Sequence, residues 1–266
     1  AFGVDLIDVS LQVRSGEVVG IAGVSGNGQQ ELLRALSGED TRAQPAMVQV
    51  TGQDVARLGP QQRRALGLHF VPEERLGRGA VPTMGLAHNL LLTRSDAVGA
   101  MGWLHLGQLK EQARAIIERF GVKAGGADAP ARSLSGGNLQ KFIVGREIAA
   151  QPKLIIIAQP TWGVDVGAAA QIHAEILALR DAGCAVLIVS EELDELFELS
   201  DRLYVLAKGH LSPSVARADA TVQQVGEWMS GLWNADVQQH LADMEQVLPS
   251  SEAAQANALV KGPQHV

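Results

Sequence analysis

The residues best suited to phosphate chemistry lie in one glycine-rich turn, Gly23-Val24-Ser25-Gly26-Asn27-Gly28-Gln29-Gln30. The turn follows an apolar run and precedes leucines at helical spacing, a context in which backbone N–H groups and a helix dipole hold phosphates. A complete phosphate loop reads Gly-x-x-x-x-Gly-Lys-Ser/Thr. Here Gln29 takes the lysine position, and Gln30 takes the position of the hydroxyl that binds magnesium. The sequence therefore predicts the shape of the loop without its charge chemistry.

Two other interpretations apply to this turn when it is taken alone. A dinucleotide fingerprint needs a third glycine three residues after Gly28. Glu31 stands there, so that match fails. A glycine turn between a strand and a helix, with no ligand at all, is an equal alternative until further motifs are considered.

A second candidate for an anion-binding nest is the string Leu134-Ser135-Gly136-Gly137-Asn138-Leu139-Gln140-Lys141. A serine hydroxyl followed by two glycines at a helix start can bind an anion. Ser-Gly-Gly by itself is common in turns, but the eight-residue string resembles the signature motif of the ABC ATPases. The resemblance implies that Ser135, Gly136 and Gly137 contact the γ-phosphate of an ATP molecule held by the opposite subunit.

Further similarities to the ABC family follow in the order that the family has them. Leu154–Thr161 resembles the strand that usually ends in Asp-Glu-Pro-Thr. The aspartate that organises magnesium in the family is replaced by Ala158, and the glutamate that activates water is replaced by Gln159. Asp165 is retained in a run similar to the D-loop. At the switch position, Glu191 stands in place of the usual histidine.

Glu73 is the best candidate for the position of the family's Q-loop glutamine. The surrounding Pro-Glu-x-Arg pattern and the run Ala158–Gly167 are similar to the second ATPase half of tandem importers of simple sugars or nucleosides. The resemblance covers about residues 5–233. Family members usually carry an earlier strand with an aromatic residue that stacks on adenine, and Phe2 lies too close to the loop for that role. We therefore expect the chain to be a fragment of a longer tandem protein.

These replacements predict a degenerate site on this chain. A lost lysine removes a charge-assisted contact of about 1.5–3 kcal/mol, and a general base reduced to an amide costs about 10²–10⁴ in rate. With Gln30 and Ala158 at the magnesium positions, Mg²⁺ is expected to be weak or absent. The chain alone is therefore expected to have little or no ATPase activity.

The resemblance implies ATP as the ligand and a second ABC ATPase half as the partner. The intact signature motif would then serve a competent site on that partner. Transmembrane permease subunits are further implied partners, together with an extracytoplasmic substrate-binding protein that the chain would reach only indirectly. We expect a peripheral protein at the cytoplasmic face of the inner membrane, with no nucleic-acid partner.

Three rival classes are considered beside the transporter. ABC proteins of translation or DNA repair need basic surfaces or large insertions, and the net charge of −7 disfavours them. A kinase is disfavoured because Gln29 replaces the required lysine. A nucleotide-sensing or structural ABC-family domain that takes no part in transport stays open as the alternative.

The elements that must position these motifs follow from hydrophobic periodicity. We expect strands at residues 6–13, 18–22, 154–157, 185–189 and 203–206. Helices are expected at 31–36 and 168–181, helical structure over 87–120, and a further helix from about residue 135. The fold is predicted to be α/β, a P-loop NTPase (RecA-like) core with an inserted ABC-type helical subdomain and an N-terminal antiparallel β portion. The predicted division is 1–84 and 150–234 for the core, 85–149 for the helical subdomain and 235–266 for a tail.

Composition agrees with this assignment. Of 266 residues, 46% are hydrophobic and 19% charged, which is enough to build a packed core. The single cysteine, Cys184, indicates a reducing compartment and excludes an internal disulfide. The seven histidines are scattered without zinc-ligand spacing. No apolar run approaches the length that spans a bilayer.

Overall fold

The computed structural model describes residues 3–94, 99–100 and 103–233, and its centre is a seven-stranded sheet. The strand order is β10-β9-β1-β8-β7-β4, with β11 also paired to β9. Strands β1, β4, β7, β8 and β9 pair in parallel, whereas β10 and β11 run antiparallel to β9. The bounds are β1 Val18–Ala22, β4 Leu68–Val71, β7 Leu154–Ala158, β8 Ala185–Ser190, β9 Arg202–Ala207, β10 His210–Leu211 and β11 Val215–Ala216.

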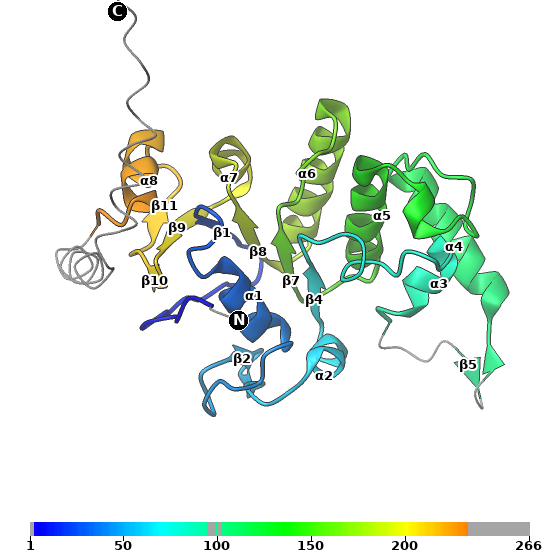
Figure 1. Cartoon of the computed structure of the whole chain (residues 1–266), viewed down its shortest axis with the longest axis horizontal. Coiled ribbons are helices and arrows are strands. Elements are labelled where there is room, and N and C mark those ends of the chain that lie inside the picture. Colours follow the sequence, from blue (N-terminus) through cyan, green and yellow to red (C-terminus); the bar gives the residue numbers. More distant parts are fainter. Residues whose placement is uncertain (1–2, 95–98, 101–102, 234–266) are drawn as a thin grey trace, which may run out of the picture.

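Helices cover the sheet on both faces (Figure 1). Their bounds are α1 Gln29–Ser37, α2 Pro60–Ala65, α3 Leu86–Leu91, α4 Leu106–Arg119, α5 Gly136–Ala149, α6 Val166–Asp181, α7 Leu193–Leu199 and α8 Val222–Met229, with a short 3-10 helix at Ala131–Ser133. Helices α5 to α8 lie on one side of the sheet and α1 on the other. Helices α3 and α4 pack with α5 beyond the β4 edge.

The burial of the strands explains their nearly continuous apolar sequence. Successive side chains of a strand point to opposite faces, so each strand supplies both cores. Val18 belongs to the core under α5 to α8, and Val19 belongs to the core under α1. All five residues of β1 are buried. The predicted strands at 18–22, 154–157, 185–189 and 203–206 are confirmed, as are the helices predicted at 31–36, 168–181 and from about 135.

The strand predicted at residues 6–13 was wrong, although its alternation of apolar and polar residues is reproduced as alternating burial. Leu6, Val9, Leu11 and Val13 pack against the α1-side core. Asp8 has a left-handed φ of 49°, which interrupts the extended backbone of this segment. The small antiparallel sheet lies later in the chain, where β2 Gln49–Val50 pairs with β3 Gln53–Asp54.

The helical structure predicted over 87–120 is confirmed at α3 and α4 but is interrupted between them. A two-stranded antiparallel ribbon, β5 Gly99–Ala100 with β6 Trp103–Leu104, separates α3 from α4. The sequence there contains Gly99 and Gly102, and glycine disfavours a helix interior by about 1 kcal/mol. The expected tail at 235–266 lies outside the described residues. Among the described helices, none is long and apolar enough to cross a membrane.

Candidate functional site

The glycine-rich turn of residues 23–30, here called the phosphate loop, joins the end of β1 to the start of α1 (Figure 1). Gly26 and Gly28 have φ angles of +89° and +108°, which side-chain-bearing residues rarely adopt. A Cβ on Gly23 would lie 2.2 Å from Nε2 of Gln29 and 2.6 Å from the carbonyl oxygen of Leu206. The predicted loop shape therefore depends on glycine both for backbone conformation and for space.

Gln29 fills the inside of the phosphate loop. Its side chain is buried, and its Oε1 accepts a hydrogen bond from the backbone N–H of Asn27 at 3.0 Å. Its Nε2 donates to the carbonyl oxygen of Val24 at 2.9 Å. The side chain of Asn27 bonds within the loop as well, with Nδ2 donating to the carbonyl oxygen of Val24 at 2.9 Å, and its Oδ1 accepts from the N–H of Lys208 at 2.8 Å. The uncharged amide at the position of the lysine thus links two backbone groups of the loop, the N–H of Asn27 and the carbonyl oxygen of Val24.

Glu191 lies on the outside of the same loop. It follows the last residue of β8, and its carboxylate accepts the backbone N–H of Ser25 at 2.7 Å. A loop N–H that could bind a phosphate oxygen is therefore already bonded to a carboxylate of this chain. An incoming phosphate would also meet the negative charge of Glu191.

Gln30, the last residue of the phosphate loop, is hydrogen-bonded to Glu73. Gln30 Nε2 donates to Glu73 at 3.0 Å, and Arg78 donates to Gln30 Oε1 at 3.2 Å. Burial, followed by the charges of Glu74 and Glu191, raises the pKa of Glu73. Since Ala158 offers only a buried methyl group and the Gln30 amide is engaged, the residues at the two magnesium positions do not fit a magnesium ion.

Gln159 comes directly after β7 and has a left-handed φ of 50°. Its Oε1 accepts from the N–H of Glu191 at 3.3 Å and lies 3.2 Å from the hydroxyl of Ser190. The Ser190 hydroxyl is nearer to the buried carboxylate of Glu195, at 2.9 Å. Burial of the Ser190–Glu195 pair fixes the end of β8 and, with it, the backbone that carries Glu191.

These residues share one small pocket at the carboxyl ends of β1, β7 and β8. It measures about 20 Å³, close to the volume that a single water molecule needs. The predicted site residues that line it are Gly23, Ser25, Gly26, Gln29, Gln30, Glu73, Ala158, Gln159 and Glu191. The structure therefore brings together most residues of the predicted own site, but their side chains are bonded to backbone groups of the site or to one another.

The predicted signature residues lie elsewhere, at the start of α5. Ser135 is the N-cap, and its hydroxyl accepts from the side chain of Asn138 at 2.8 Å. Within the part of the chain that the structure describes, the backbone N–H groups of Gly136 and Gly137 have no hydrogen-bond acceptor. Asp165 caps α6 by accepting from the N–H of Ala168 at 3.0 Å. None of these four predicted residues lines the 20 Å³ pocket.

The side chains that connect these motifs were not among the predicted site residues. Gln140 of α5 donates to the carbonyl oxygen of Pro160 at 3.0 Å, next to Gln159. Arg75 donates to Gln140 at 3.1 Å and also to the carbonyl oxygen of Trp162. Arg75 stood in the Pro-Glu-x-Arg pattern, but that pattern carries no information about which distant segment the side chain contacts.

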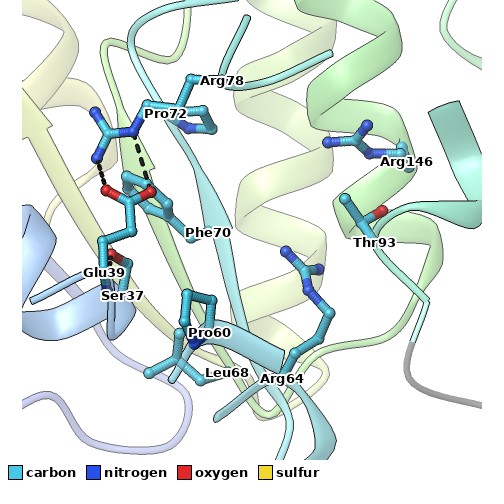
Figure 2. A pocket seen from close by; sticks show the side chains of 10 residues that line it. All are labelled: Ser37, Glu39, Pro60, Arg64, Leu68, Phe70, Pro72, Arg78, Thr93 and Arg146. Atoms are coloured by element: carbon cyan, nitrogen blue, oxygen red, sulfur yellow. Dashed lines mark hydrogen bonds and ion pairs between the residues drawn. The ribbon is translucent and has the colours of Figure 1, made fainter. Parts of the chain in front are cut away.

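A larger pocket of about 170 Å³ lies between α2, β4 and α5, and three arginines line it (Figure 2). Arg78 reaches Glu39 across the ring of Phe70. Arg64 and Arg146 both pair with Glu147. Because each arginine already has a carboxylate partner, the pocket does not attract an anion through unpaired positive charge.

Known proteins resemble this chain in sequence. A family model described as "ABC transporter" matches residues 6–162. The chain is 40% identical over 226 residues to the guanosine import ATP-binding protein NupO of Bacillus subtilis, covering 84% of this chain and 44% of that protein. It is 41% identical over 230 residues to the glucose import ATP-binding protein TsgD13 of Haloferax volcanii, covering 85% and 42%. The chain thus spans less than half the length of these relatives.

Solved structures match the fold. The dimeric ABC transporter cassette MJ0796 gives a TM-score of 0.68 at 20% identity, covering 80% of this chain and 90% of that one. A nucleotide-free ATP-binding cassette from an ABC transporter gives 0.68 at 24% identity, covering 89% and 93%. The predicted α/β cassette fold is therefore confirmed.

Proposed function

The chain belongs to the ABC transporter family, and on that premise we propose that it is the nucleotide-binding domain of an importer for nucleosides or simple sugars. Two similar proteins carry the words guanosine import and glucose import in their names, which supports this cargo class. We infer that it acts as a peripheral subunit at the cytoplasmic face of the inner membrane. Its partners are permease subunits and, indirectly, an extracytoplasmic binding protein.

In this proposal, residues 1–84 and 150–234 form the nucleotide-binding core and 85–149 the helical subdomain. The chain corresponds to the second half of a tandem ATPase. The Pro-Glu-x-Arg pattern around Glu73 supports that assignment.

The chain's own site is proposed to hydrolyse ATP slowly or not at all. Gln29 provides no cation, Gln159 is no base, and Ala158 gives no metal ligand. The bonds from the N–H of Ser25 to Glu191 and from the N–H of Asn27 to Gln29 support this. A nucleotide would have to displace both before the loop could hold its phosphates.

The observation that carries the proposal is the contrast between two anion-binding nests. In the phosphate loop, the N–H groups of Ser25 and Asn27 are bonded to side chains of this chain, whereas those of Gly26 and Gly28 have no acceptor among the described residues. At the start of α5, the N–H groups of Gly136 and Gly137 are without acceptors among the described residues, and Ser135 is exposed. Unpaired N–H groups at a helix start attract an anion through the helix dipole.

We therefore propose an asymmetric head-to-tail pair of ATPase halves. A competent half holds ATP and Mg²⁺ with its own loop, and Ser135, Gly136 and Gly137 of this chain donate hydrogen bonds to the terminal phosphate. Donors fixed in advance stabilise negative charge as it develops in the transition state. Asp165 and Glu73 belong to segments that would move with closure of the pair.

The test is ATP turnover by the assembled transporter, with this chain and its competent half both present. Ser135→Ala should reduce turnover strongly, by about 10²-fold, as loss of a transition-state donor does. Gln159→Ala should leave turnover nearly unchanged, since the proposal gives Gln159 no part in attack on ATP. The reverse order would contradict the asymmetric assignment. If both variants are as active as the wild type, the alternative of a nucleotide-sensing or structural domain is favoured.

A further inference from the structure

Arg75 connects three segments that are distant in the sequence. It stands after β4, and its Nε donates to Oε1 of Gln140 in α5 at 3.1 Å. Its Nη2 donates to the carbonyl oxygen of Trp162, in the loop after β7. The guanidinium also lies over the Trp162 ring, 5.3 Å from its centroid. One planar side chain thus holds the start of α5 to the loop that leads to Asp165.

The positive charge of Arg75 is not neutralised within the described residues. Its acceptors are an amide and a carbonyl, and its neighbour Glu74 pairs with Arg78 instead. Burial without a compensating carboxylate lowers the pKa of Arg75. Nη1 makes no hydrogen bond to any described residue, although each guanidinium nitrogen is a donor.

The two glycines of the signature motif make this arrangement possible. A Cβ on Gly136 would lie 2.6 Å from Nη1 of Arg75, so a side chain there would displace the guanidinium. A Cβ on Gly137 would lie 3.1 Å from the carbonyl oxygen of Gly163, in the same loop as Trp162. The glycines therefore give room to the chain's own loop and arginine, as well as to any phosphate.

We propose that Arg75 is a positioning residue that locks the signature nest to the Trp162–Asp165 loop, so that both reach the partner half as one rigid unit. This inference rests on the proposed function, because the unit matters only if the nest is donated across an interface. Arg75 acts through Gln140 and Trp162, and its unneutralised charge adds to the positive end of α5. Lysine cannot replace it, because only a guanidinium offers a planar fork with separate donors for two acceptors.

The experiment compares Arg75→Ala and Arg75→Lys in the assembled transporter. Both should lower kcat for ATP by roughly 10- to 100-fold, since a displacement of about 1 Å is enough to cause such losses. The KM for ATP should change by less than about threefold, because the competent half's own loop sets it. In a Ser135→Ala background, Arg75→Ala should add no further loss, because both changes disable one nest. Losses that multiply would indicate general destabilisation and overturn the proposal.

Arg217 provides a matched control. It donates to the carbonyl oxygen of Phe197 and lies 5.0 Å from that ring's centroid, so its contacts are of the same kind. It follows β11, at the other end of the sheet from α5 (Figure 1). Arg217→Ala should leave turnover unchanged. If Ser135→Ala abolishes turnover while either Arg75 variant is fully active, the role of Arg75 is wrong and the proposed function stands. If Ser135→Ala is itself fully active, the proposed function fails.

Discussion

Glu191 accepts the N–H of Ser25, and Gln29 accepts the N–H of Asn27, so the residues that replace the switch histidine and the lysine bond to the loop itself. Gln30 and Glu73 bond to each other in the same way. Gln29 is buried, whereas Ser25 and Glu191 are exposed, so the cost of about 1–3 kcal/mol for an unpaired buried group applies to the Gln29 amide. The side chains at these positions therefore bond to the loop or to each other, which supports the proposal that this site has lost its function.

Removing the Glu191 carboxylate should partly reopen the loop. Glu191→Ala frees the N–H of Ser25 and removes a negative charge that repels phosphate. We expect the isolated chain to bind a fluorescent ATP analogue about tenfold more tightly, equivalent to about 1.4 kcal/mol. Equilibrium titration with and without Mg²⁺ measures this change.

The adjacent Glu192 is the control for that titration. It is exposed, and its carboxylate makes no hydrogen bond or ion pair with the described residues. Glu192→Ala removes the same charge from the same segment and should leave affinity as it is. If both variants bound the ATP analogue equally more tightly, the effect would come from the overall charge of the segment. If Glu191→Ala did not change the affinity, its carboxylate would not compete with phosphate.

At the scale of elements, the sequence predicted what local periodicity determines. The strand at 185–189 and the helix beginning beside Ser135 could be placed because a buried strand is continuously apolar and a serine N-cap precedes a helix. The segment 6–13 could not, because alternation reports burial and not the hydrogen-bonded partner. Residue types at the motif positions predicted a degenerate site, which stays a prediction.

The contacts between the site residues could not be predicted from local periodicity. Glu191 and Ser25 are 166 residues apart, and Arg75 and Trp162 are 87 apart. Only the fold brings such pairs together. A single sequence carries no pattern that links them, whereas local spacing was enough to locate the loop and the signature.

Helix α5 gives a stability test of its packing. Gly145 lies in its interior, and an added Cβ would be 2.6 Å from the fully buried ring of Phe120. Gly145→Ala gains about 0.5–1 kcal/mol of helix propensity but overpacks the core at a cost of about 1–3 kcal/mol. The free energy of unfolding, measured with urea, should therefore fall.

Gly226 in α8 is the counterpart, because an added Cβ there meets nothing within 4 Å. Gly226→Ala should raise the free energy of unfolding by about 0.5–1 kcal/mol, through propensity alone. If Gly145→Ala stabilised the chain as Gly226→Ala should, the close contact between α5 and Phe120 would be incorrect.

At the scale of the whole molecule, a buried cluster of charges joins the helices beyond β4 to the sheet. Glu147 of α5, which is 1% exposed, accepts from Arg64 of α2 and lies 2.8 Å from Nδ1 of His69 in β4. Its other oxygen accepts from Arg146 at 3.0 Å. Arg146 continues to the carbonyl oxygens of Asn89 and Gly79. One carboxylate thus pairs with arginines of α2 and α5 and bonds a histidine of β4 at the junction.

This junction predicts how stability depends on pH. Burial alone raises the pKa of Glu147, but Arg146, His69 and Arg64 outweigh it and lower the pKa from 4.5 to about 2. The stabilisation is therefore complete above pH 4.5 and is lost as the pH falls towards 2, with a slope of up to about 1.4 kcal/mol per pH unit. Glu147→Gln should remove this slope from urea unfolding measured between pH 3 and 6. At pH 7, Glu147→Gln should lower the free energy of unfolding by about 3–5 kcal/mol, because it leaves buried cations uncompensated.

The Arg119–Glu175 pair is more exposed, so Glu175→Gln should lower the free energy of unfolding by less than about 1 kcal/mol. Equal losses in the two variants would show that the Glu147 cluster does not hold the helices to the sheet.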